Sequence, residues 1–481
     1  MPIGDILPEI AVLLTAVVVL LTAAFTPQRT HRVCAGLALA GLAVAGWLVT
    51  RQAGADRLTF HGVWALDDAS RWGRLLILAA TAAVIPLCPR WFATDRRHGE
   101  LYAVLLFSAL GAMGLAAAAD LLQVVICVLL SSVTGYTLAA WHRDWAPSVE
   151  AGMKYFLVGA LANVLLVLGV ALLVGLLGDP GYPAIAAALA APDVGSPLLL
   201  TGAALAVVGL AFKLGAVPAH TWMPDVAEGA PAPMAAFLTV VPKIGAAVAL
   251  ARLVSLVPPD ALALRPVVAA VSVATMTVGN LGALGQDDVR RLLGWSSVSQ
   301  SGYALMAVTV VGLTDAALPA LMLFLAAYAV ANLTAFAVVV HLRGLTERAA
   351  WAGLATERPW PALAFIAAVL SLVGIPPLAG FFGKLTLFLA ALDGAYVWLA
   401  VAAVANTVVS LAYYLRVVAP MVFAAPPQAP RATLGRLTAA AVAAGLLLTV
   451  GLGLAAEAGF AVADGMTLLP GYSELRNSKL H

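Results

Sequence analysis

Long apolar stretches dominate the chain, separated by short clusters of arginine, aspartate, proline or glycine. Most stretches hold roughly 20 residues or more, the length that an α-helix needs to cross a bilayer. Transmembrane β-strands would show weaker segments of about ten alternating residues. Backbone groups in lipid must pair within their own segment, so we expect every stretch to be helical. The pattern predicts an all-α polytopic membrane protein of about fourteen transmembrane helices, at 5–26, 33–50, 72–89, 101–118, 120–140, 150–177, 198–218, 232–256, 264–285, 291–313, 316–342, 360–390, 394–418 and 437–460.

Composition narrows the class of protein further. Of the 481 residues 63% are hydrophobic and 10% are charged, whereas a soluble domain has about a quarter of its residues charged. The net charge of +2 and the lack of a basic block exclude nucleic acid as a partner. Asp5 and Glu9 stand where a cleavable signal peptide would carry basic residues, so the first span is expected to be retained. Cys34, Cys88 and Cys127 show no paired spacing, and we expect no metal, haem or cluster in this chain.

The basic residues predict an orientation in the membrane. Fourteen arginines fall in loops after odd-numbered spans, against eight basic residues in the other loops and the two tails. Because cytoplasmic loops are enriched in Lys and Arg, the odd loops are expected in the cytoplasm and both termini outside. The loop from Arg51 to Arg74 runs against this trend.

Four lysines, Lys154, Lys213, Lys243 and Lys384, lie inside apolar stretches. Arginine keeps its proton in proteins, whereas a lysine that is removed from water can release it, so an intramembrane lysine suits reversible proton loading. Lys154 follows Glu150 by four residues near a helix start, and this spacing favours a structural ion pair there. The other three have many apolar residues on both sides and are the stronger functional candidates.

Two spans are interrupted by glycine and proline close to a lysine. One break contains Pro218, with His220 two residues later, and the other contains Pro376 and Pro377. Helix breaks within a membrane leave backbone polar groups that persist only against protein or a water-filled cavity. The breaks fall in the seventh and twelfth spans, and an offset of five inverts topology, so we expect an inverted repeat with ion sites at the breaks.

At these residues the chain resembles the antiporter-like subunit family of respiratory complex I, the bacterial NADH:quinone oxidoreductase. The resemblance covers nearly the whole chain in order and is carried by SVEAGMKYFLVGALA (148–162), GLAFKLGAVPAHTWMPDVAEGAPAPMAAFLTVVPKIGA (209–246), GNLGALGQDDVRRLLGWSSVSQSGY (279–303) and LSLVGIPPLAGFFGK (370–384).

The resemblance implies two inverted five-helix repeats with broken seventh and twelfth helices. It divides the chain into N-terminal helices (1–100), a first repeat (101–256), a second repeat (257–425) and a last helix with a tail (426–481). In the proton pathway, Lys213 would be the central loading group, Lys243 would pass the proton across and Lys384 would be the exit-side carrier. His220 could relay protons or could equally be a capped helix-end histidine. Glu150 also matches a family position.

The family also implies the setting. The chain would be a subunit of a proton-translocating oxidoreductase in the bacterial inner membrane, surrounded by the lipid bilayer, with no catalytic site of its own. Subunits K and M would be its neighbours. FMN, iron–sulfur clusters and quinone would belong to partner subunits, and this chain would bind no cofactor.

The sequence departs from the family at two positions. Leu129 stands in the fifth span where relatives carry a glutamate that modulates the lysine of the seventh span. Without it, Lys213 lacks its usual partner, and Lys243 becomes the expected source of the switching charge. Gln300 stands in the tenth span where relatives often have histidine, and glutamine cannot carry a proton at neutral pH.

These departures leave alternatives open. One is a scaffolding paralogue that completes the membrane arm but pumps poorly. A second is a subunit of a cation/proton antiporter complex or a membrane hydrogenase, and a solute carrier is more distant. The chain has no Rossmann glycine motif, P-loop or catalytic triad that would support an independent enzyme.

Overall fold

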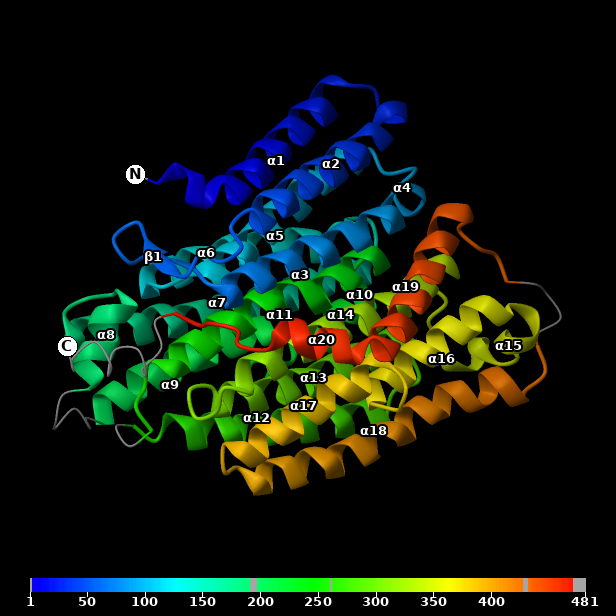
Figure 1. The fold of residues 1–481 in the computed structure, drawn as a ribbon. Coiled ribbons are helices and arrows are strands. Elements are labelled where there is room, and N and C mark those ends of the chain that lie inside the picture. The colour runs from blue at the N-terminus through cyan, green and yellow to red at the C-terminus, as the bar shows by residue number, and fades with distance from the viewer. Residues whose placement is uncertain (1, 191–196, 260–261, 427–430, 470–481) are drawn as a thin grey trace.

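The structure is a computed structural model that describes residues 2–190, 197–259, 262–426 and 431–469. They form one bundle of helices that run roughly alongside one another (Figure 1). The N-terminal helices are α1 (Leu7–Phe25), α2 (Arg32–Thr50), α3 (Asp68–Val84) and α4 (Cys88–Trp91). The next group comprises α5 (His98–Ala117), α6 (Leu121–Ala139), α7 (Ala146–Leu177), α8 (Tyr182–Leu189), α9 (Pro197–Leu214), α10 (Trp222–Gly229) and α11 (Ala232–Ser255).

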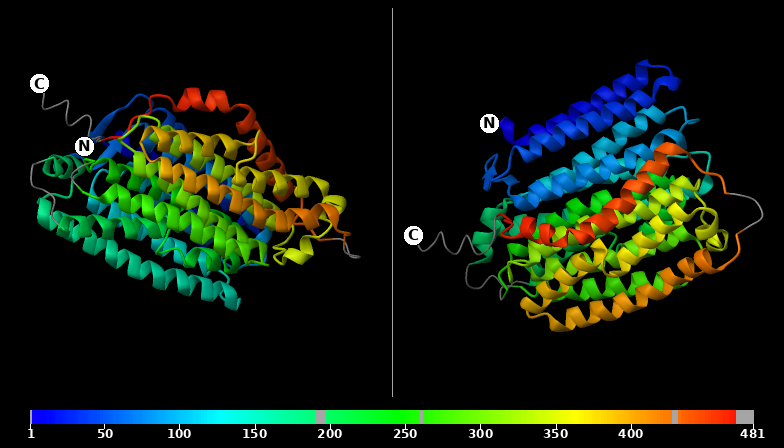
Figure 2. Two further views of the ribbon diagram at one scale, coloured as in Figure 1. Left: turned by 90° about the horizontal axis from the view of Figure 1, so that it is seen from below. Right: turned by 45° about the vertical axis from the view of Figure 1, so that its right-hand side comes forward.

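The second half of the chain repeats this order of long helices. It comprises α12 (Leu264–Leu284), α13 (Val289–Val310), α14 (Ala317–His341), α15 (Leu354–Glu357), α16 (Pro359–Val373), α17 (Ala379–Asp393) and α18 (Val397–Phe423). The last pair, α19 (Arg436–Leu454) and α20 (Ala456–Ala463), lies on the outside of the bundle (Figure 2).

The helices account for the fourteen predicted spans. Among the described residues, twelve helices are long and apolar enough to cross a membrane. The polar helix α13 and the broken pair α16–α17 supply the other two, and the pair α9–α10 forms the broken seventh span. Each repeat therefore contains five spans, α5 to α11 and α12 to α18. Because five is odd, the second repeat runs through the membrane in the opposite sense to the first.

Both breaks begin with the same backbone turn. Gly215 (φ 68°) ends α9 and Gly374 (φ 96°) ends α16 in the left-handed conformation that glycine adopts readily. In each case the next amide donates to a carbonyl five residues back, from Ala216 to Ala211 and from Ile375 to Leu370. This is the Schellman motif, so both helices end with the same glycine-containing turn. Both breaks also contain a cis peptide bond, before Pro218 and before Pro377.

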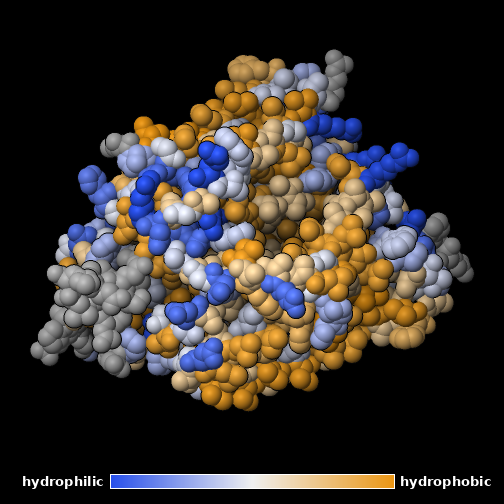
Figure 3. Space-filling model, in the orientation of Figure 1, coloured by the Kyte–Doolittle hydropathy of each residue, from blue (hydrophilic) through white to orange (hydrophobic). Residues whose placement is uncertain are grey.

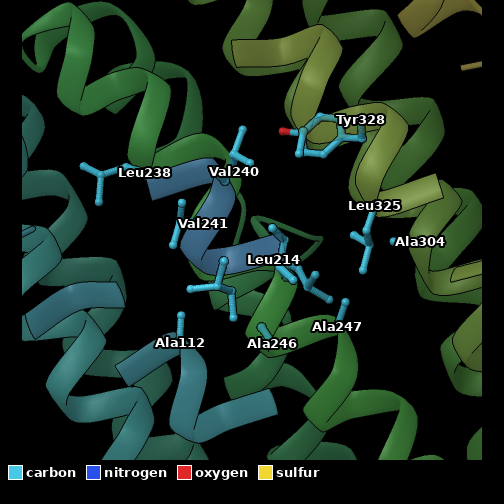
Figure 4. Close-up of a cluster of buried hydrophobic side chains, with 14 of the residues drawn as sticks. Ala112, Leu214, Leu238, Val240, Val241, Ala246, Ala247, Ala304, Leu325 and Tyr328 are labelled. Atoms are coloured by element: carbon cyan, nitrogen blue, oxygen red, sulfur yellow. The ribbon is translucent and has the colours of Figure 1, made fainter. Parts of the chain in front are cut away.

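The core is centred on α11, whose membrane window is buried throughout. Figure 4 shows Leu238, Val240 and Val241 of α11 facing side chains from neighbouring helices, among them Ala112 of α5 and Tyr328 of α14. The outer surface is also largely apolar on the face drawn in Figure 3. A buried central helix and an apolar exterior are what a helical bundle in lipid requires.

A short antiparallel hairpin, β1 (Arg57–Thr59) and β2 (Trp64–Leu66), follows α2 and was not expected from the sequence. Beside it, Asp67 caps the start of α3 and forms a buried ion pair with Arg252 of α11 at 2.5 Å. The backbone of Leu469 hydrogen-bonds to both partners of the pair. The C-terminal segment 464–469, here called the C-terminal strap, is thereby held at the end of the bundle where the chain begins.

The orientation argument needs one correction. Arg74 and Arg252, which the sequence analysis counted with the loops, lie inside α3 and α11 and are fully buried. Arg74 pairs with Glu9 at 3.4 Å, and Arg252 pairs with Asp67. Buried arginines are therefore present in addition to the buried lysines. These two are neutralised by carboxylates, whereas the buried Arg265 and Arg290 donate to backbone carbonyls. Arg476 and Lys479, also counted there, lie outside the described residues.

Candidate functional site

Lys243 lies at the centre of a buried polar cluster between α11 and α13. Its Nζ donates to the carbonyl oxygen of Ser297 at 2.5 Å, to Ser297 Oγ at 2.7 Å and to Ser301 Oγ at 2.8 Å. These three acceptors match the three hydrogens of an ammonium group. All of them are neutral, so the charge is held by dipoles.

A second layer of polar groups fixes this cluster. Ser297 Oγ lies 2.6 Å from the hydroxyl of Tyr328, which donates to the carbonyl of Thr239 at 2.7 Å. Asn332 Nδ2 donates to Thr239 Oγ1 at 2.9 Å. The Tyr328 ring also faces Lys243, with its centroid 5.3 Å from Nζ. Side chains of α11, α13 and α14 thus form one connected network around a single ammonium.

Lys213 occupies the last turn of α9, directly before the first break. It is completely buried, and its Nζ makes no hydrogen bond within the described chain. The Nζ lies 5.5 Å from the ring centroid of Phe212 and 5.8 Å from that of Tyr155. Tyr155 stacks on Trp222 of α10 with centroids 4.1 Å apart. Aromatic faces attract a cation and also pack against a neutral amine, so this pocket accommodates both charge states of Lys213.

Lys384 lies on α17 and reaches back across the second break. Its Nζ donates to the carbonyl of Val373, the last residue of α16, at 3.1 Å. It lies 4.0 Å from the ring centroid of Tyr303, whose hydroxyl is 2.8 Å from Thr407 Oγ1. The second buried lysine of the broken spans is therefore held by a backbone carbonyl and an aromatic face.

The remaining sequence candidates lie apart from this buried row. His220 is half-buried in the first break, 5.7 Å from the ring of Trp295, and its Nδ1 has no hydrogen bond within the described residues. Glu150 is 65% exposed and pairs with Lys154 at 2.7 Å, the ion pair that their spacing predicts. Leu129 is 41% exposed, so a carboxylate at this position would lie at the surface of the chain.

The hydroxyl groups of the tenth and eleventh spans and the amide of Asn332 were missed by sequence reasoning, which had singled out Gln300. Ser296, Ser297, Gln300 and Ser301 lie close together on α13, and all four are buried. The signal was present in the sequence, because an internal span with this many polar residues can be stable only if they meet polar partners.

The arrangement suits reversible transfer of protons. Three lysines lie in the interior of the bundle, among hydroxyls, backbone carbonyls and aromatic rings. An ionisable group in such a place is costly, and it is retained where a pathway needs it. The geometry positions the amine of Lys384 against a backbone carbonyl at the second break, and it links the amine of Lys243 to the first break through Ser301.

Comparisons with known proteins agree with this geometry. Residues 118–410 match the family model described as NADH:quinone oxidoreductase/Mrp antiporter, TM. NADH-quinone oxidoreductase subunit N of Mycobacterium sp. (strain JLS) is 45% identical over 395 residues, which are 82% of this chain and 83% of the relative. NADH-quinone oxidoreductase subunit N 1 of Streptomyces griseus subsp. griseus is 43% identical over 457 residues, 93% of this chain and 95% of the relative.

Solved structures share the fold. A chain of respiratory complex I from Thermus thermophilus with bound Aureothin is 30% identical, with a TM-score of 0.81 that covers 94% of this chain and 98% of that chain. A chain of the Mrp complex from Dietzia sp. DQ12-45-1b has a TM-score of 0.85 at 23% identity and covers 96% of both chains. This chain therefore belongs to the NADH:quinone oxidoreductase/Mrp antiporter family of membrane subunits and, within it, to the NADH-quinone oxidoreductase subunit N group.

Proposed function

We propose that this chain translocates protons as a membrane-arm subunit of a NADH:quinone oxidoreductase, through Lys213, Lys243 and Lys384. The observation that carries the proposal is the contact of buried amines with the broken helices. Lys384 donates to the last carbonyl of α16, and Lys243 reaches the last carbonyl of α9 through Ser301. A change in the charge of Lys384 therefore acts directly on a helix end, and a change in the charge of Lys243 acts on one through Ser301.

The proton step itself needs no cofactor. An N–H bond of one ammonium breaks, a new N–H bond forms at the next neutral amine, and the positive charge moves with the proton. Two neighbouring ammonium groups repel each other, so loading one lysine favours release from the next. Lys213 is the loading group, Lys243 passes the proton across the centre, and Lys384 releases it.

The proposal includes the setting of the chain. In this proposal the chain lies in a bacterial plasma membrane next to subunits K and M, with both termini outside. NADH oxidation and quinone reduction take place in partner subunits that hold FMN, iron–sulfur clusters and quinone, and this chain binds none of them. Its part is to convert a conformational or electrostatic signal from those subunits into proton movement.

The test is to replace the buried lysines in the assembled complex. Lys213→Ala and Lys384→Ala are each expected to abolish most proton pumping and coupled quinone reduction, because the pathway loses a carrier. Lys213→Arg should not restore activity, since a guanidinium keeps its proton. Pumping is measured in inverted vesicles by quenching of a pH-sensitive dye, and assembly is checked on native gels.

Lys154→Ala is the matched control. Lys154 is 45% exposed and pairs with Glu150, so its removal should leave pumping at the parental level. Full coupled activity in Lys213→Arg would refute the role of Lys213 as a loading group. If Lys213→Ala, Lys384→Ala and Lys213→Arg all reduce quinone and pump protons at the parental rate, the scaffolding alternative would be favoured instead.

A further inference from the structure

Two neighbouring residues of α13 contact the two helix breaks. Ser301 Oγ donates to the carbonyl of Leu214, the last residue of α9, at 2.5 Å. Gln300 Nε2 donates to the carbonyl of Leu372, in the last turn of α16, at 3.0 Å. One helix of the second repeat therefore binds the end of the broken helix in both repeats.

These carbonyls are available because prolines remove their helical partners. In an α-helix the carbonyl of residue i accepts from the amide of residue i+4, and proline has no amide hydrogen. Residue i+4 is Pro218 for Leu214 and Pro376 for Leu372. An unpaired buried carbonyl is costly, so the hydroxyl of Ser301 and the amide of Gln300 replace the missing donors.

The same rule explains the contact of Lys384. The carbonyl of Val373 would be paired with residue 377, which is also a proline, and it accepts from Lys384 instead. Two adjacent free carbonyls at the second break are thus shared between the uncharged amide of Gln300 and an ammonium.

The hydrogen bonds of Ser301 also depend on the charge state of Lys243. A serine hydroxyl has one hydrogen to donate. While Lys243 is an ammonium, it donates to Ser301 Oγ, and the hydroxyl hydrogen is shared between the carbonyl of Leu214 at 2.5 Å and that of Ser297 at 3.0 Å, with the shorter contact to Leu214. A neutral Lys243 has a lone pair that competes for the same hydrogen, and the carbonyl at the first break would then lose its donor.

We propose that Gln300 and Ser301 are positioning residues that couple the two breaks through α13: the charge on Lys243 acts on the first break through Ser301, and the adjacent Gln300 binds the second break. The proposal rests on the proposed proton translocation and deepens it. It gives Gln300 a role that does not require it to carry a proton. The simpler alternative is that the two side chains only satisfy buried carbonyls, each independently of the other.

The experiment uses the complete complex in native membranes and compares Ser301→Ala, Gln300→Met and the double variant. Each single change is expected to lower the rate of coupled pumping about tenfold, the order expected for the loss of one hydrogen bond in or next to a charged network. Quinone reduction should fall less than pumping, because the signal is generated elsewhere. If the two residues act as a unit, the double variant should be no slower than the slower single variant.

Two further variants separate coupling from packing. Ser301→Thr keeps the hydroxyl and should restore most of the pumping lost in Ser301→Ala. Ser299→Ala removes a buried hydroxyl of the same helix that has no hydrogen bond within the described chain, and it should pump normally. Assembly of each variant is compared on native gels.

Each outcome distinguishes coupling of the two breaks from independent capping of two carbonyls. Losses that multiply in the double variant, or a Ser301→Thr variant as impaired as Ser301→Ala, would overturn the coupling and leave two independent caps. Parental pumping in both single variants would overturn it as well. In either case a defective Lys384→Ala variant would show that proton translocation itself still holds, whereas an active one would refute the proposed function.

Discussion

The buried ion pair between Asp67 and Arg252 gives a quantitative prediction about stability. Both side chains are completely buried, and Asp67 accepts two hydrogen bonds from Arg252, at 2.5 and 3.1 Å. Asp67→Ala would leave the guanidinium buried without its counter-charge, a change that costs about 3–5 kcal/mol in proteins. The change also frees the amides of Leu469 and Ser70, which Asp67 binds at 2.7 and 2.8 Å.

The pair also makes stability depend on pH. Burial alone would raise the pKa of Asp67, but the adjacent guanidinium and the hydrogen bonds from Leu469 and Ser70 hold that pKa below its ordinary value of 3.8. For a carboxyl with a lowered pKa, the stabilisation is complete above the unfolded value and is lost as the pH falls through the folded value. The contribution of Asp67 should therefore be constant at neutral pH and disappear only in strong acid.

The assay is thermal unfolding of the purified protein in detergent, with proteolysis of the C-terminal strap as a second readout. Asp287→Ala is the control, because Asp287 pairs with Arg348 at 2.6 Å while its side chain is 75% exposed. Exposed pairs contribute about 0–1 kcal/mol. Asp67→Ala should lower Tm several times more than the control and expose the strap to protease. Equal shifts in the two variants would refute the reasoning.

Three further predictions follow from single contacts. Tyr303→Leu should lower pumping more than Tyr303→Phe, because only phenylalanine keeps the aromatic face under Lys384; equal rates in the two variants would argue against a role for the ring. Gly380→Ala should disrupt the second break and assembly on native gels, since a Cβ there would lie 1.7 Å from the carbonyl oxygen of Ser371, whereas Gly46→Ala, which meets no atom within 4 Å, should assemble normally. A tag at either terminus should be accessible from outside intact cells, and protection of such a tag would contradict the proposed orientation.

Much of the fold could be predicted because its signals are local. A hydrophobic run of membrane length specifies a helix, and a glycine and proline beside a buried lysine marks a break. The hairpin at Arg57–Leu66 was missed, since it is short and lies in a charged loop. The buried ion pairs of Arg74 and Arg252 were also missed, because their carboxylate partners are far away in the sequence, as Asp67 is from Arg252.

In the candidate site, too, local features could be predicted and contacts between distant segments could not. The sequence identified Lys213, Lys243 and Lys384 as cations in apolar surroundings, but the partners of these lysines come from other helices. Nothing in the pattern around Ser301 indicates that its hydroxyl reaches a carbonyl 87 positions away in the sequence. Leu129 was expected to matter because it stands where relatives carry a glutamate that modulates the lysine of the seventh span, yet its side chain lies partly at the surface. Contacts between distant segments are decided by packing, which no local pattern records.

The polarity of α13 has a consequence for how the protein is made. Helices enter a bilayer from the translocation machinery according to their own hydrophobicity, and polar residues near a helix centre oppose that step. Among the helices of membrane-spanning length described here, α13 is left out of the apolar set by its serines and arginines. We therefore expect α13 to be retained in the membrane only once α14 has followed it. A truncated chain that ends after α13 should be a better substrate for membrane proteases than one that ends after α14.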